Sequence, residues 1–119
     1  AKEVKKAVFE LSIKSWQNYA NGLKPIASSW IENLASNASK VAVADSTGVE
    51  LNKTKFATAV FLFGKKLKRL LGQEQNIGLV LPSTAGGLIA NMAVLSLGKT
   101  IVNLNYSSGF ESLKYAIEL

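Results

Sequence analysis

The sequence predicts a mixed α/β fold with a short β-hairpin, a parallel β-α-β unit and packed helices. Three observations predict it. Two short apolar segments flank a turn signal at residues 41–51. Two continuous apolar segments, at residues 76–81 and 99–104, flank a helical pattern. The length of 119 residues and the apolar share of 48% are enough for one domain with a core.

The first part of the chain predicts two helices. Residues 3–20 carry apolar side chains at steps of three and four in two series, so a broad apolar side is expected, and Asn21-Gly22 ends the helix. Trp16 and Tyr19 lie near its end. This side can pack on its own domain, on a partner domain or on a membrane surface. Residues 25–37 form the second helix, with Pro25 in its first turn.

The middle of the chain predicts a hairpin and a long amphipathic helix. Residues 41–44 and 49–51 are its strands, and the turn between them accounts for Asp45. Residues 53–71 form a helix that Gly72 ends, and Phe61 lies off its apolar stripe and is expected on an exposed apolar surface. The stripe expected to face the core comprises Phe56, Val60, Phe63, Leu67 and Leu70, with Lys65, Lys68 and Arg69 opposite.

The last part predicts the β-α-β unit and a final helix. The strand at residues 76–81 is continuously apolar, which is typical of a strand that helices cover on both faces. Residues 85–97 form a helix with Gly98 after its end, and residues 99–104 return as a parallel strand. We expect Ser108 to cap the final helix, with Glu111 as its capping-box partner. The inward side of the connecting helix is expected to comprise Ile89, Met92, Ala93 and Leu97.

The residue inventory excludes most catalytic chemistry. The chain has no histidine and no cysteine, and its single aspartate is Asp45. We therefore predict no catalytic, cofactor-binding or metal-ligating residue in this chain. The net charge of +6 permits contact with nucleic acid, anionic lipid or an acidic protein, and does not choose among them.

Three segments are candidate binding sites. The loop PSTAGG at residues 82–87 precedes a helix, a position that favours phosphate, but it lacks the nucleotide-binding glycine motifs and their lysine. Its glycines are more simply explained by close packing of the helix on the sheet. Tyr106 and residues 107–109 follow a parallel strand at its carboxyl end, where sheets place ligands and where ordinary connections also run.

The basic segment at residues 64–71 is the third candidate. Its cations are Lys65, Lys66, Lys68 and Arg69. They form either a solvated face or a contact for anionic lipid or a carrier protein. The segment lacks the interleaved aromatics of RNA-binding strands, so no nucleic-acid partner is predicted.

Neither a signal peptide nor a membrane span is predicted. The basic N-terminus lacks an apolar core and a cleavage site. The uncharged stretch at residues 75–98 is long enough to span a bilayer, but Pro82, the adjacent glycines and Asn91 interrupt it. Strand, turn and helix explain it better.

Residues 76–119, from NIGLVLPSTAGG to the end, resemble the first Rossmann-like unit of the adenylate-forming, AMP-binding enzymes, which include the acyl-CoA synthetases. The similar features are the strand ending in Leu81-Pro82, the turn at residues 95–98 and the asparagines at residues 103–105. The stretch VAVADSTGVELNKTKFATAVFLFGKKL resembles the family's opening hairpin and helix, with Lys53 where many members have an aromatic residue.

The run at residues 105–109 and the FGKKL segment are similar to one subgroup of this family. That subgroup comprises fused bacterial enzymes that join a lysophospholipid acyltransferase, acting on 2-acylglycerophosphoethanolamine, to an acyl-[acyl-carrier-protein] synthetase. The resemblance implies a connector helix at residues 1–22 and an incomplete large domain at residues 23–119.

The implied parent activity is ATP- and Mg-dependent activation of a carboxylate to an acyl-adenylate, then transfer to a thiol, in recycling of phospholipid acyl chains. The implied location is cytoplasmic, with the parent peripheral on the inner membrane, and the implied partners are the rest of the parent, acyl carrier protein and an anionic membrane surface. This chain by itself is expected to be inert and to self-associate. The alternatives are a self-standing basic module for anionic lipid or acyl carrier protein, and a small nucleotide-binding domain using residues 82–87.

Overall fold

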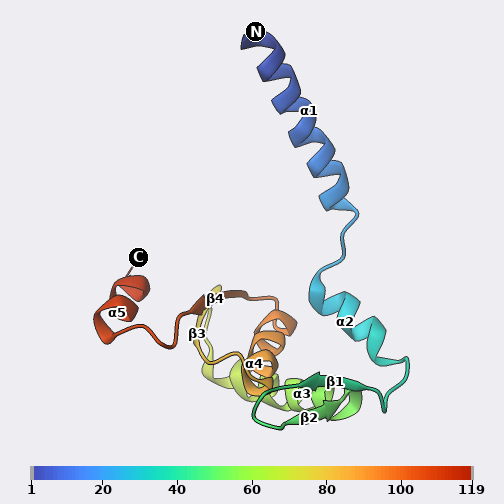
Figure 1. Ribbon diagram of the computed structural model, residues 1–119, viewed down its shortest axis with the longest axis vertical. Coiled ribbons are helices and arrows are strands. Elements are labelled where there is room, and N and C mark those ends of the chain that lie inside the picture. Colours follow the sequence, from blue (N-terminus) through green and yellow to red (C-terminus); the bar gives the residue numbers. More distant parts are fainter. Residues whose placement is uncertain (1, 119) are drawn as a thin grey trace.

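The computed structural model describes residues 2–118, and its elements follow the predicted order (Figure 1). They include an antiparallel hairpin and a parallel pair of strands joined by a helix, so the predicted mixed α/β class is confirmed. The elements are α1 (Lys2–Asn21), α2 (Ile26–Leu34), β1 (Val41–Ala44), β2 (Glu50–Asn52), α3 (Lys53–Leu70), β3 (Asn76–Val80), α4 (Ala85–Ser96), β4 (Thr100–Leu104) and α5 (Phe110–Glu118).

Each sheet has two strands. β1 and β2 pair antiparallel, and Gly48 in the turn between them has a φ of 85°, a conformation that glycine adopts without a steric penalty. β3 and β4 pair parallel and in register from Asn76 opposite Thr100 to Val80 opposite Leu104. The predicted parallel connection through α4 is therefore confirmed.

The core lies where α3 packs on α4 beneath the hairpin. Phe56 and Val60 of α3 and Met92 and Ala93 of α4 are buried together. Gly64 of α3 faces Ala93 of α4, and a Cβ at position 64 would lie at an ordinary contact distance of 3.9 Å from Ala93. The half-buried side chains packed around this cluster are Trp30, Val43, Leu51, Leu67, Ile89 and Leu95.

The predicted core stripe of α3 is only partly correct. Phe56 and Val60 are buried, whereas Phe63 is 37% and Leu70 is 71% exposed. The stripe repeats every 3.5 residues on average, so it drifts around a helix of about 3.6 residues per turn and leaves the buried side. Ala57 and Gly64 complete that side instead, which is a correction to the prediction.

The prediction that helices cover both faces of β3 is wrong for this chain. Ile77 is buried on the face that α4 covers. On the opposite face, Val80 and Val102 are 41% and 42% exposed. The connecting helix covers one face only, and a second layer would have to come from an element that residues 2–118 do not supply.

Two helix boundaries differ from the prediction. Pro25 stands just before α2 rather than inside it, and α2 ends at Leu34 instead of residue 37. The final helix α5 begins at Phe110, since the Gly109 carbonyl accepts the N–H of Leu113.

The predicted capping box of Ser108 and Glu111 is therefore wrong. The carbonyl of Asn105 accepts the N–H of Ser108 and its side-chain oxygen accepts that of Ser107. Ser108 therefore belongs to a turn at residues 105–108 and not to the cap of the helix, which otherwise forms as predicted.

Helices α1 and α5 extend away from the core (Figure 1). Neither contains a buried residue. The radius of gyration is 18.8 Å, against about 13–14 Å for a compact chain of this length. The interpretation in which the first helix packs on its own domain is thus not what the structure shows. None of the described helices is both long and apolar enough to cross a membrane.

Candidate functional site

A groove of about 640 Å³ lies at the carboxyl ends of β3 and β4. It joins two segments that the sequence singled out separately, the loop at residues 82–87 and Tyr106. Within these segments, Ala85, Gly86, Ser107, Ser108 and Gly109 do not line it. The lining residues are Leu81, Pro82, Ser83, Thr84, Gly87, Leu88, Asn91, Asn103, Leu104, Asn105 and Tyr106.

Two asparagines order the floor of this groove. The Asn91 amide donates to the Gly87 carbonyl over 2.9 Å. Its side-chain oxygen accepts from the Asn103 amide over 3.1 Å, which links α4 to β4. Neither asparagine was predicted as a site residue, and the available signal in the sequence was an asparagine within each of two otherwise apolar elements. The lining offers amides and hydroxyls, so it can bind a polar group by hydrogen bonds and supplies no carboxylate, amine or imidazole for proton transfer.

Asp45 connects the hairpin to this region. Its Oδ1 accepts the N–H of Thr47 over 2.9 Å and that of Val49 over 3.3 Å, so the predicted turn role is confirmed. Its Oδ2 also accepts the N–H of Ala85 over 2.8 Å, at the first turn of α4. The Ala85 N–H is the main cause that lowers the pKa of Asp45 to about 2, with the Thr47 hydroxyl next.

The carboxylate of Asp45 makes the start of α4 unfavourable for phosphate. A helix N-terminus attracts an anion, and here the protein's own anion lies there. A nucleotide phosphate at the same N–H would meet like charge. Among residues 2–118, no three Asp, Glu, His or Cys side chains lie close enough together to hold a metal ion. The residues of this groove therefore do not fit ATP and Mg²⁺.

Gly87 has a packing role that explains the glycine in this loop. A Cβ at position 87 would lie 2.4 Å from the Pro82 carbonyl oxygen, so only glycine allows this approach. A Cβ at Gly86 would meet nothing closer than the Thr84 hydroxyl at 3.7 Å. A close approach therefore explains Gly87, but its partner is the loop after β3 and not the sheet that we predicted, and no close approach explains Gly86.

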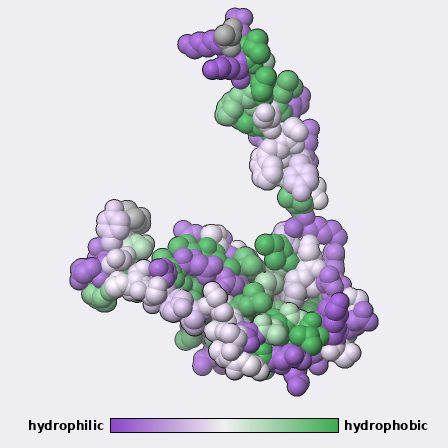
Figure 2. Space-filling model, in the orientation of Figure 1, coloured by the Kyte–Doolittle hydropathy of each residue, from purple (hydrophilic) through white to green (hydrophobic). Residues whose placement is uncertain are grey.

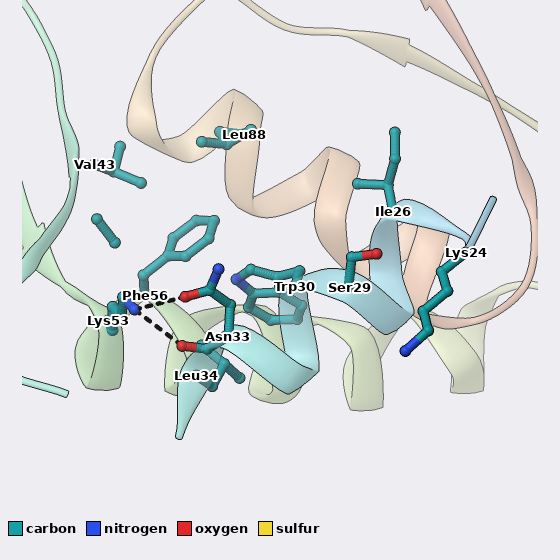
Figure 3. A pocket seen from close by; sticks show the side chains of 11 residues that line it. Lys24, Ile26, Ser29, Trp30, Asn33, Leu34, Val43, Lys53, Phe56 and Leu88 are labelled. Atoms are coloured by element: carbon teal, nitrogen blue, oxygen red, sulfur yellow. Dashed lines mark hydrogen bonds between the residues drawn. The ribbon is translucent and has the colours of Figure 1, made fainter. Parts of the chain in front are cut away.

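A second hollow, of about 490 Å³, lies between α2, the hairpin and α4 (Figure 3). The Trp30 ring meets Phe56 edge-on at 5.7 Å and lies 5.7 Å from the Phe61 ring. Phe61 keeps about half of its surface exposed, as predicted. Most of the lining is apolar, with Lys24, Ser29, Asn33 and Lys53 as its polar members.

Lys53 closes one side of this hollow by binding the end of α2 (Figure 3). Its Nζ donates to the carbonyl and side-chain oxygens of Asn33, each over 2.9 Å, and to the Ser36 carbonyl over 2.7 Å. The carbonyl end of a helix favours a cation, so the ammonium stabilises α2. The structure thereby gives a physical reason for the lysine that the sequence marked only as a departure.

The basic segment lies at the end of α3. Lys68 and Arg69 occupy its last turn, where cations complement the helix dipole, and Lys65 and Lys66 precede them. All four are exposed. This location explains the charges by helix stabilisation, and contact with lipid or a carrier protein stays a prediction.

No protein-family model matches this chain, and no curated protein matches it significantly. The resemblance to the adenylate-forming family accordingly stays a prediction from the sequence.

Proposed function

We propose that this chain is a scaffolding subdomain of an ATP-dependent acyl synthetase of the adenylate-forming kind. In this role it forms one wall of a larger domain and performs no chemistry itself. The parent would activate a carboxylate to an acyl-adenylate and transfer the acyl group to the thiol of a carrier protein or coenzyme A. The observation that supports the proposal is the parallel sheet that is covered on one face only.

A parallel sheet of only two strands with one uncovered face is rarely a complete structure. Parallel sheets occur almost only with both faces covered, because their strands are apolar on both sides. In β3 and β4, Val80 and Val102 leave an apolar face exposed. Both outer edges of this pair are also free of strand partners among the described residues. Further strands and a second helix layer would complete it.

A second apolar surface supports the same conclusion. A groove of about 580 Å³ runs between α3 and α4 on the side away from the hairpin core. Leu62 is 65% exposed there, and Phe63 joins it because the stripe of α3 drifts off the buried side. Lys66 is the single charged residue that lines it. An exposed apolar groove of this kind can accept a contact with another domain.

The catalytic groups of such a synthetase would come from elsewhere in the parent. The start of α4 already holds Asp45, so the loop at residues 82–87 would contribute shape rather than phosphate binding. Asn91 and Asn103 would order the carboxyl edge of the sheet, where α/β enzymes place their ligands.

The first test is the size of the native polypeptide. An antibody against this chain is used on an immunoblot of the source cells, and the proposal expects a product several times larger than 12.7 kDa. The purified native product is then assayed for fatty-acid-dependent exchange of pyrophosphate into ATP. The 119-residue chain serves as the matched control and should show no exchange.

Two results would refute the proposal. Turnover by the chain alone would show that it is not a scaffold. A native product near 12.7 kDa would show that the domain stands alone, and the four exposed cations of the basic segment at residues 64–71 would then favour a basic module that binds lipid or a carrier protein.

A further inference from the structure

We propose that α1 lies on the surface of an anionic membrane, parallel to it, with its apolar side in the lipid interface. This goes beyond the scaffolding role and is independent of it. The helix extends away from the core (Figure 1), carries both hydrophobic and hydrophilic surface (Figure 2), and has no buried residue. Its large apolar side chains are 41% to 67% exposed, and they are Val4, Val8, Phe9, Leu11, Ile13, Trp16 and Tyr19.

The width of the apolar side favours a surface over a partner helix. At about 100° per residue, the arc from Leu11 through Tyr19 and Trp16 to Ile13 spans about 200°. A partner helix in a coiled coil covers only a narrow seam of two positions in seven. A lipid interface covers about half of a helix at once. The remaining arc carries Glu3, Lys6, Glu10, Lys14, Gln17 and Asn18.

Lys5 argues further against a protein partner. By the same helical geometry it projects from the middle of the apolar arc. It forms no ion pair with any of residues 2–118, whereas the neighbouring Lys6 pairs with Glu10 at 3.9 Å. An unpaired ammonium in a dry protein interface would be costly. At a membrane, the flexible stem of Lys5 lies along the lipid and its ammonium reaches the phosphate headgroups.

The charge of α1 specifies which membrane. This helix contains four lysines and two glutamates, and the whole chain has a net charge of +6. Each cation near an anionic surface adds to binding, and salt weakens that contribution. Near the C-terminal end of α1, the rings of Trp16 and Tyr19 lie 5.8 Å apart. Amphipathic rings of this kind prefer the membrane–water interface.

The connection to the core allows α1 to bind without disturbing the fold. Gly22 and Leu23 donate their N–H groups to the last turn of α1, and Pro25 precedes α2. Four residues, 22–25, therefore separate the two helices. Because α1 contains no buried residue, substitutions on its apolar side should affect binding and leave the core intact.

The test is flotation of the full chain with phosphatidylcholine vesicles that contain or lack phosphatidylglycerol. We expect binding to the vesicles with phosphatidylglycerol, and loss of most of it between about 0.1 M and about 1 M salt. The double variant Phe9→Gln/Trp16→Gln should bind at least about tenfold more weakly. Gln17→Ala/Asn18→Gln, on the opposite arc, should bind as the unchanged chain does. Circular dichroism checks that all variants keep their helices.

Three outcomes would overturn the proposal. The first is no flotation with phosphatidylglycerol vesicles. The second is flotation that survives Phe9→Gln/Trp16→Gln but is lost in Lys65→Gln/Lys66→Gln/Lys68→Gln, since α3 would then be the lipid contact. The third is a dimer in sedimentation that Phe9→Gln/Trp16→Gln disrupts without any vesicle binding, since a second copy would then cover α1.

Discussion

Replacing Gly87 with alanine tests how α4 is seated on the loop after β3. The added Cβ would lie 2.4 Å from the Pro82 carbonyl oxygen, whereas ordinary contacts begin at 3.4 Å. The loop would have to open by roughly 1 Å. That oxygen is backbone and also accepts the N–H of Thr84 over 2.9 Å, so it cannot simply rotate away as a side chain would.

The expected free-energy change has two opposing parts. Overpacking of this kind costs about 1–3 kcal/mol. Alanine offsets up to about 1 kcal/mol of that, because it restricts the unfolded chain and favours helix. Gly87→Ala should therefore lower the free energy of unfolding by about 1–2 kcal/mol and the melting temperature by roughly 5 °C. Gly86→Ala meets nothing closer than 3.7 Å, so it should stabilise by up to about 1 kcal/mol.

The assay is urea unfolding monitored by tryptophan fluorescence. A Trp16→Phe background is used, so that Trp30, beside the core, is the one tryptophan whose fluorescence changes on unfolding. The two alanine variants form a matched pair, since they differ only in position within one helical turn. Equal stabilities for the pair, or a Gly87→Ala variant more stable than its parent, would refute the close-approach reasoning.

Two further predictions concern charged side chains. The pKa of Asp45 is about 2 in the folded chain against 3.8 without these contacts, so its stabilising effect is complete above pH 4 or so and disappears as the pH falls towards 2. The difference in urea midpoint between the chain and Asp45→Asn should thus be large at pH 6 and shrink over that window, and a constant difference would contradict it. Lys53→Met removes the cation from the end of α2 and should destabilise by about 1–2 kcal/mol with faster amide exchange in α2. Lys55→Met, an exposed neighbour, should change stability by less than about 0.5 kcal/mol, and equal losses in both would exclude the capping role of Lys53.

The order and type of the elements could be predicted from local patterns. The spacing in residues 53–71, the turn at Asp45-Gly48 and the two apolar strands each carry their own signal, and each produced the expected element. Gly98 follows α4 with a φ of 71°, as expected of a residue after a helix end. The predicted helix boundaries were wrong where a turn competed with the helix, as at Asn105 before α5.

The contacts that give the candidate site its chemistry could not be predicted in this way. Asp45 meets Ala85 across forty positions, and Lys53 meets Ser36 across seventeen. Neither contact produces a periodic pattern in the sequence. A single polar side chain at a turn or at a helix start already has a local explanation, so nothing in the sequence indicates the distant partner. The apolar pattern of β3 indicates two covered faces, and the covering of the second depends on elements that residues 2–118 do not provide.

The long-range hydrogen bond from the Ala85 N–H to Asp45 has a consequence for the order of folding. The hairpin and the β-α-β unit can each begin from contacts close in sequence, but the carboxylate meets α4 only after the long intervening segment has been closed. We expect this contact to form after the main barrier to folding. An interaction of that kind acts chiefly on the rate of opening rather than the rate of folding. Asp45 would therefore determine how long the hairpin stays attached to α4, and it would have little influence on how quickly the two first meet.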